Sequence, residues 1–196
     1  MYSILKSKGK DGNYYNGSVG KGFGYGAQKG LLIAQGNADS RAGIRLSGAD
    51  IIIGGQVTKP IPAIEHGNIG IRSNIKGFAF EYMTNGRGLV LGDIGPWACA
   101  GMTGGVIYQR LQPEMGLTKE AISRRMAIGA KVSIQALNKQ GIEDINELLT
   151  QYIGLLREHN QLTEAAQLEA LLPNLSDHFV QIVPIKEQAD PSISTE

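Results

Sequence analysis

Short β-prone runs recur at nearly constant spacing over residues 1–110, and this periodicity restricts the possible folds more than any other feature. The runs are centred near residues 32, 52, 70, 90 and 107, so the steps between neighbouring centres are almost equal. They are Leu31–Ile33, Ile51–Ile53, Ile69–Ile71, Leu89–Leu91 and Val106–Tyr108. Three-residue runs bracketed by Gly or Asn are typical of strands joined by tight turns. A sustained period of this kind indicates a repeat architecture.

One phrase recurs with the same period: Met83-Thr84-Asn85-Gly86 is followed, one period later, by Met102-Thr103-Gly104-Gly105. If each repeat is one coil of a right-handed parallel β-helix, matching strands stack about 4.8 Å apart, and residues one period apart lie above each other. The Met pair then shares an interior position, the Thr pair a corner, and Gly86 and Gly105 a backbone bend. We therefore predict a mainly β solenoid with a C-terminal α-helical extension. A β-sandwich remains the alternative.

Glycine divides the chain into two unlike parts, because 23 of its 27 glycines lie in residues 1–110. The first part carries a net charge of about +6 and the second about −5. We expect a glycine-rich parallel β-helix over residues 1–110, a helical extension that packs on it over 111–187, and a flexible tail over 188–196. Opposite charges could help the two parts, or two subunits, to dock.

Beyond Pro113 the sequence pattern predicts both helices and strands. Thr118 is a candidate N-cap for a short helix that runs to about Ile128. The predicted elements that follow are a strand at Lys131–Leu137, an amphipathic helix at Glu143–His159, a helix at Thr163–Leu172 stopped by Pro173, and a last strand at Phe179–Pro184. The helices would cover an open end of the strand stack, which protects strand edges from aggregation.

Composition excludes several classes of function. The net charge of +1 provides no overall field that would attract nucleic acid or an anionic membrane. No apolar run approaches the roughly 18 residues of a membrane helix, and residues 1–13 lack the apolar centre of a secretory signal. We therefore expect a cytoplasmic protein that binds neither nucleic acid nor membrane. Cys99 is the only cysteine, so neither an intrachain disulfide nor a thiolate cluster can form.

Several of these motifs together resemble the C-terminal glycine-repeat (GXGXG) domain of the glutamate synthase large subunit. The matching segments are Glu81–Gly86, Leu89–Gly92, Ala100–Gly105, Tyr25–Ala27, Arg45–Asp50, Leu148–Leu172 and Phe179–Pro184. The resemblance extends over roughly residues 24–184 and implies a right-handed parallel β-helix. Two departures stand out: the family's earlier coils have no counterpart before Tyr25, as in an N-terminally shortened stand-alone version, and residues 56–77 form a longer connection that predicts an extra loop or coil.

The resemblance implies a structural role rather than catalysis. In glutamate synthases an amidotransferase domain with an N-terminal cysteine releases ammonia, and a barrel domain with FMN and an iron-sulfur cluster uses it. Related glycine-repeat domains also occur as separate subunits in archaeal glutamate synthases, N-methylglutamate synthase and formylmethanofuran dehydrogenase. The expected partners are therefore amidotransferase and FMN-domain subunits in a homo- or hetero-oligomer, with FMN and the cluster on those partners and no cofactor on this chain.

No residue pattern predicts a catalytic, cofactor-binding or metal site. Gly20–Gly26 lacks the Gly-Lys-Ser/Thr sequence of a phosphate loop, and coil corners explain its glycines better. Cys99 has no adjacent His, and His66, His159 and His178 are too scattered to form a metal set. One candidate binding face remains, for an anion or an acidic partner, against the alternative of solvated charges. It comprises Arg41, Arg45, Arg72 and Arg87.

Three functional hypotheses follow. The first is a noncatalytic structural subunit or domain of a glutamate-synthase-like complex in nitrogen metabolism, at the interface along which ammonia passes. The second is a free-standing oligomeric β-helix scaffold or ligand-binding protein. The third, an enzyme with Glu81 or Asp93 as its acid-base group, lacks any recognisable pairing of nucleophile and base.

Overall fold

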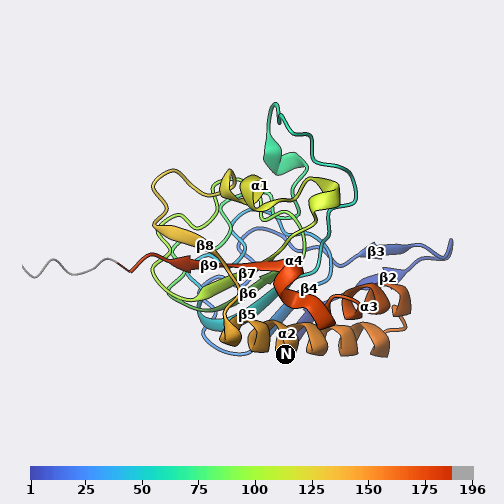
Figure 1. Cartoon of the computed structure of the whole chain (residues 1–196). Helices are drawn as coiled ribbons and strands as arrows, with labels where there is room; N and C mark the ends of the chain where they lie inside the picture. The colour runs from blue at the N-terminus through green and yellow to red at the C-terminus, as the bar shows by residue number, and fades with distance from the viewer. Residues whose placement is uncertain (187–196) are drawn as a thin grey trace, which may run out of the picture.

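A seven-stranded sheet, parallel over most of its width, organises the chain (Figure 1). The computed structural model describes residues 1–186, so the tail predicted for 188–196 lies outside the described residues. The order across the sheet is β1-β4-β5-β6-β7-β9-β8. The strands are β1 (Tyr2–Ile4), β4 (Leu31–Ala34), β5 (Ser47–Ile53), β6 (Asn85–Val90), β7 (Val106–Arg110), β9 (Phe179–Pro184) and β8 (Val132–Ala136). A separate antiparallel hairpin pairs β2 (Lys6–Lys8) with β3 (Tyr14–Asn16).

The sequence period sets the register of the parallel strands. Leu32 pairs with Ile51, and Gly88 pairs with Ile107, so both pairs are separated by one period of the sequence. Ile51 and Gly88 are also partners, although the stretch of chain between them is almost twice as long. The strands predicted around residues 32, 52, 90 and 107 are therefore confirmed, and they stack in chain order.

The predicted strand at Ile69–Ile71 is wrong, because this run forms the 3-10 helix η1. It lies in the long connection between β5 and β6, where Asn68 caps η1 by accepting a hydrogen bond from Gly70 N at 2.9 Å. Ile71 is exposed rather than buried in the sheet. The chain rejoins the stacked repeats only near Ile75, which forms a parallel bridge with Ala38. Residues 56–77 are thus an extra loop and not an extra coil.

The prediction of a right-handed parallel β-helix is also wrong, because the chain has a mixed α/β fold. Only one face of each repeat pairs continuously; the opposite side of the stack consists of turns joined by isolated bridges such as Val19 to Ala38. The sheet then continues through β9 and β8, which pair antiparallel with β7 and with each other. Strands from residues after 111 therefore complete the sheet instead of only covering its end.

Alternate side chains of the strands enter two different cores. On one face, Ile33, Ile52 and Leu89 pack beneath the long helix α2 (Lys139–Glu158), which runs along the sheet (Figure 1). On the other, Ile51 and Ile53 pack against side chains from the stacked turns. A strand buried on both faces is expected to be almost continuously apolar, which explains the Ile51–Ile53 run.

The remaining elements complete the C-terminal part. They are η2 (Pro113–Met115), α1 (Lys119–Ser123), α3 (Leu162–Glu169), η3 (Leu172–Asn174) and α4 (Leu175–His178). The predicted N-cap is confirmed, since Thr118 Oγ1 accepts a hydrogen bond from Ala121 N at 3.2 Å. The predicted helices over 143–159 and 163–172 correspond to α2 and α3, although α2 begins earlier than predicted, where Asn138 Oδ1 caps Gly141 N.

Candidate functional site

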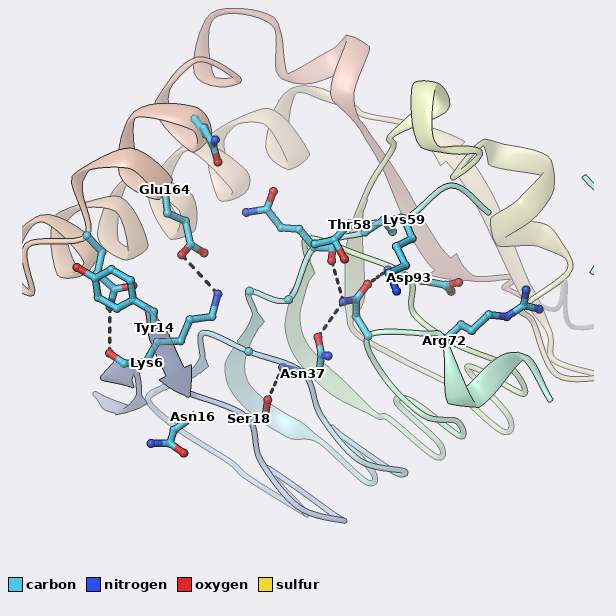
Figure 2. Close-up of a pocket in the computed structure, with 18 of the residues that line it drawn as sticks. Lys6, Tyr14, Asn16, Ser18, Asn37, Thr58, Lys59, Arg72, Asp93 and Glu164 are labelled. Carbon is cyan, nitrogen blue, oxygen red and sulfur yellow. Dashed lines mark hydrogen bonds and ion pairs between the residues drawn. The ribbon is translucent and has the colours of Figure 1, made fainter. Parts of the chain in front are cut away.

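A pocket of about 1060 Å³ opens where the parallel strands β4 and β5 end. Gly36 and Asn37 follow β4, Gly54 and Gly55 follow β5, and all four residues line the pocket. The hairpin β2–β3, the loop after β5 and the beginning of α3 form its walls (Figure 2). The outer carboxyl edge of parallel strands is a usual place for ligand sites in open α/β sheets. This pocket is therefore the candidate functional site.

A buried amide network closes the end of the pocket beside α3. Gln35 is fully buried, and its Nε2 donates to Gln161 Oε1 and to Glu164 Oε2, the latter at 2.7 Å. Gln161 Nε2 returns a hydrogen bond to Gln35 Oε1 at 2.9 Å. Lys6 Nζ lies 3.7 Å from Glu164 Oε2, as Figure 2 shows. The carboxylate at this end is thus already partnered by a cation and by an amide donor.

Asparagine side chains connect successive repeats across the pocket floor. Asn74 Nδ2 donates to Asn37 Oδ1 at 2.8 Å, while Asn74 Oδ1 accepts a hydrogen bond from Asp93 N at 2.8 Å. On the other side, Asn37 N donates to Ser18 Oγ at 3.1 Å (Figure 2). This ladder ties residues of successive repeats together.

Two carboxylates at the opposite end of the pocket share a buried arginine, Arg125. Its Nε and Nη2 donate to Asp93 at 2.9 and 2.8 Å, and its Nη1 donates to Glu65 at 2.6 Å. Burial disfavours the charged guanidinium, but the hydrogen bonds to both carboxylates outweigh it and raise the pKa of Arg125. Arg72 Nη2 lies 4.0 Å from Glu65 and adds a second positive charge.

The charges of the pocket that have no partner are positive. Lys8 and Lys59 line it, and neither forms an ion pair within residues 1–186. The carboxylates that line it are those of Glu65, Asp93 and Glu164, each of which has a cationic partner. The arrangement can hold an anion, while no described residue in it is set up as a nucleophile with an adjacent base.

The repeated Met-Thr phrases lie one above the other, away from the pocket. Met83 and Met102 are both buried in the core on the turn side of the sheet. Thr103 N donates to Met83 O at 2.9 Å, as Thr84 N does to Leu46 O. Gly86 and Gly105 have left-handed backbone conformations, with φ of 97° and 79°. The backbone of Gly104 lies so close to the repeat before it that an added Cβ would collide with Thr84 O.

The four arginines proposed as one face lie in different surroundings. Arg72 borders the pocket, whereas Arg87 lies between the sheet and α2, bound to Asp50, Asp144 and Glu147. The hydrogen bonds that Arg87 donates to Asp50 are the largest of the effects that raise its pKa.

Arg41 and Arg45 belong instead to a row of exposed and half-exposed side chains on the turns, here called the aromatic ridge. It comprises Tyr25, Arg41, Arg45, Phe78, Tyr82 and Trp97. The Arg41 guanidinium lies 5.4 Å from the Phe78 ring centre, and the Phe78 and Trp97 rings stack with centroids 5.1 Å apart. All but Tyr25 have positive φ. Tyr82 and Trp97 remain 51% and 48% exposed.

The other candidate residues have structural surroundings. Cys99 is buried, and burial raises the pKa of its thiol to about 12, which leaves it protonated and unreactive at neutral pH. His159 Nδ1 lies 3.0 Å from Leu155 O at the end of α2. Glu81 pairs with Arg41 at 3.1 Å, and Asp93 pairs with the buried Arg125 at 2.8 Å. The glycines of Gly20–Gly26 lie in turns, not before a helix.

Within residues 1–186, no group of three or more His, Cys, Asp or Glu side chains is arranged to hold a metal ion. A cluster that needs several cysteines does not fit a chain with a single buried thiol. None of the helices in this part of the chain is long and apolar enough to cross a membrane.

The sequence singled out only two residues that line the pocket: Arg72, as part of the candidate anion-binding face, and Asp93, as a possible acid-base group. Arg125, Glu65 and Asp93 come from three distant segments, and no local pattern marks them as partners. The one available signal was polar residues after strand ends, such as Asn37 after β4 and Asp93 after β6, because such ends share one edge of a parallel sheet.

Comparison with known proteins identifies relatives of most of this chain in sequence. The family described as "GXGXG motif" matches residues 63–185. The glutamate synthase [NADPH] large chain of Bacillus subtilis is 29% identical over 163 residues, which cover 82% of this chain and 9% of that protein. The ferredoxin-dependent glutamate synthase 2 of Synechocystis is 32% identical over 171 residues, 85% of this chain and 9% of the relative. This chain thus spans less than a tenth of the length of these relatives, and it belongs to the GXGXG motif family, as a glutamate-synthase-related domain.

Proposed function

We propose that the chain is a noncatalytic structural domain or subunit of a cytoplasmic glutamate-synthase-like complex in nitrogen metabolism. The observation that carries the proposal is the match itself. More than four-fifths of the chain aligns with one small segment of proteins whose names describe complete glutamate synthases. A segment of such an enzyme is expected to act together with the other parts of the enzyme.

The surroundings of the candidate reactive groups support a structural role. Within residues 1–186, Cys99 is buried and protonated, and the carboxylates of Glu81 and Asp93 are bound in ion pairs. In the proposed complex, a glutamine amidotransferase subunit releases ammonia and an FMN synthase subunit uses it, and FMN and the iron-sulfur cluster belong to these partners. The present chain contributes to the interface along which ammonia passes.

The aromatic ridge is the surface that best suits such partners. Trp, Tyr and Arg are the residue types that most often dominate binding energy at protein interfaces. Here Tyr82, Trp97 and Arg45 extend from turns whose backbone is stacked on neighbouring repeats, so their positions are fixed before binding. A fixed surface loses little conformational entropy on association. In the complex, this ridge would be buried against another subunit.

The proposal is tested by reconstitution. The tagged chain is recovered from its native lysate, and any amidotransferase and FMN-barrel polypeptides that accompany it are expressed with and without it. We expect one complex by light scattering, and a glutamine-dependent rate of glutamate formation that falls when the chain is omitted while the ammonia-dependent rate persists. Equal glutamine-dependent rates with and without the chain, or turnover by the chain alone, would contradict the proposal.

A matched pair of variants locates the interface. Tyr82→Ala combined with Trp97→Ala removes two exposed rings of the ridge, and Tyr15→Ala removes an exposed ring from the hairpin. We expect the ridge variant to weaken assembly at least tenfold and the hairpin variant to assemble normally. Circular dichroism and thermal unfolding of the isolated variants show whether each remains folded.

A second candidate function is a free-standing ligand-binding protein, and the pocket of about 1060 Å³ is the observation that favours it. A chain with this role would purify as a homo-oligomer or monomer without amidotransferase or flavin-domain companions.

A further inference from the structure

The pocket at the carboxyl edge of the sheet is larger than packing requires. Protein interiors are close-packed and contain few voids larger than a water molecule. A pocket of about 1060 Å³ is instead at the upper end of the range for small-molecule sites. Neither the stacked turns nor the aromatic ridge depends on this space, so a structural role leaves the pocket unexplained.

The charge of the pocket selects the kind of ligand. Lys8 comes from the hairpin and Lys59 from the loop after β5, and both line the pocket without an ion-pair partner in residues 1–186. Arg72 adds a third cation, only weakly engaged by Glu65 at 4.0 Å. The carboxylates that line the pocket carry three negative charges, whereas the cations in or beside its lining carry five positive charges, so a ligand would meet a net excess of two positive charges; the cations are Lys6, Lys8, Lys59, Arg72 and Arg125.

Neutral groups around the cations add hydrogen-bond donors. Asn37 uses its Oδ1 to accept from Asn74, while its Nδ2 donates no hydrogen bond within residues 1–186. Thr58 and Thr163 also line the pocket. The first turn of α3 faces the same space through residues 161–164, and no side chain of the described residues caps it. Glu164 lies in the same turn and offsets part of the positive charge of the helix N-terminus, although Lys6 pairs with its carboxylate.

The residue types that line the pocket argue against a nucleotide as its ligand. Among the described residues that line the pocket, Tyr14 is the only aromatic one, and its hydroxyl already lies 3.5 Å from Asn160 O. Binding of a nucleobase usually relies on a stacking surface. The pocket is therefore better suited to an aliphatic molecule with more than one anionic group, whose carbon chain can contact apolar lining residues such as Val57, Ile61 and Leu162.

We propose that this pocket binds a small aliphatic polyanion, held chiefly by Lys8 and Lys59, with Arg72 at the edge of the site and with Asn37 and the start of α3 as hydrogen-bond donors. Carboxylate and phosphate groups share the chemistry that these residues recognise. The site goes beyond the structural role proposed above and does not depend on it, because it is formed by residues of this chain alone.

Titration calorimetry of the purified full-length chain at low ionic strength tests the site. Citrate probes polycarboxylates, fructose 1,6-bisphosphate probes phosphate esters, and glucose is the uncharged control. We expect one of the two anions to bind at a stoichiometry of one with a Kd below 1 mM, and glucose not to bind. Absence of binding by both anions at 10 mM would overturn the proposal.

Variants separate the site from general anion attraction. Lys8→Gln with Lys59→Gln should weaken binding by about tenfold or more per lysine, as expected for a lost charge-assisted hydrogen bond. Lys29→Gln with Lys119→Gln removes the same charge from exposed positions outside the pocket and should leave the Kd unchanged. Thr163→Trp, at an exposed helical position that lines the pocket, should weaken binding by placing a bulky ring at the α3 wall. If both lysine pairs weaken binding equally, or if Thr163→Trp has no effect, the site is refuted.

Discussion

Arg125 and Asp93 form a two-point ion pair in the interior, with Arg125 Nε 2.9 Å from Asp93 Oδ1 and Arg125 Nη2 2.8 Å from Asp93 Oδ2. The guanidinium is fully buried, and Asp93 also accepts a hydrogen bond from Gly95 N at 2.9 Å. The pair joins the turn after β6 to the segment after α1, and through Glu65 it also holds the long loop. It therefore fixes one wall of the pocket to the sheet.

Removing one member of this pair should be strongly destabilising. Asp93→Ala leaves Arg125 buried without one of its two carboxylate partners, and such a change costs about 3–5 kcal/mol of unfolding free energy. Urea denaturation of the variant and the wild type measures the loss. Glu81→Ala is the matched control, because it breaks the pair with the exposed Arg41 and should cost less than about 1 kcal/mol. Equal losses would show that the buried pair contributes no more than a surface pair.

The stacked motif predicts a difference between two glycines with the same backbone angle. Gly105 and Gly129 both have φ of 79°. An added Cβ at Gly105 would lie 2.8 Å from Gly86 O, whereas at Gly129 it would meet nothing within 4 Å. We expect Gly129→Ala to cost about 1–2 kcal/mol through the left-handed conformation alone. Gly105→Ala should cost about 1–3 kcal/mol more, because the stacked repeats must separate. Thermal unfolding of both variants decides the point, and equal shifts in Tm would exclude a contribution from stacking.

The predictions from sequence succeeded where the local sequence pattern favoured the same element that the tertiary packing requires. Ile51–Ile53 is buried on both faces of a parallel strand, so its continuous apolar run predicted the strand correctly. Ile69–Ile71 has a similar apolar composition, yet it lies within a loop and forms η1. Local composition could not show that the partner of Ile51 on the next strand would be Gly88, beyond this loop.

The wrong fold class has a similar cause. The sequence period determines which residues stack, but not how many faces of each repeat pair as strands. The antiparallel addition of β9 beside β7 joins residues that are far apart in the chain, such as Ile107 and Ile182, and the sequence carries no signal for that pairing. The pocket was missed for the same reason, since Lys8, Lys59 and Glu164 line it although they lie far apart in the sequence.

The thiol of Cys99 should be inert in the folded chain. Burial raises its pKa to about 12, so almost no thiolate exists at pH 8, where an unfolded cysteine with a pKa near 8.5 is partly ionised. Labelling with a chromogenic disulfide reagent at pH 8 should therefore be at least a hundredfold slower in buffer than in urea. Fast labelling of the native chain would contradict a buried position for Cys99.

The contact between Asp144 and its partners predicts a specific loss of stability in acid. Burial alone would raise the pKa of Asp144, but hydrogen bonds from Tyr108, Gln140 and Arg87 outweigh it, so the pKa lies below its usual value. A carboxyl group with a lowered folded-state pKa stabilises the fold above its unfolded pKa of about 3.9. That contribution is lost as pH falls through the folded-state value.

Asp144→Asn, which keeps the shape of the side chain, should therefore reduce the unfolding free energy at pH 6 and make less difference as the pH approaches 3. Urea denaturation at several pH values measures the gap between wild type and variant. Glu158→Gln is the control, because Glu158 is exposed at the end of α2 and forms no ion pair within residues 1–186. The difference in unfolding free energy between the wild type and Glu158→Gln should stay near zero at every pH. A gap for Asp144→Asn that is constant between pH 6 and pH 3 would mean that its ionisation does not stabilise the packing of α2 on the sheet.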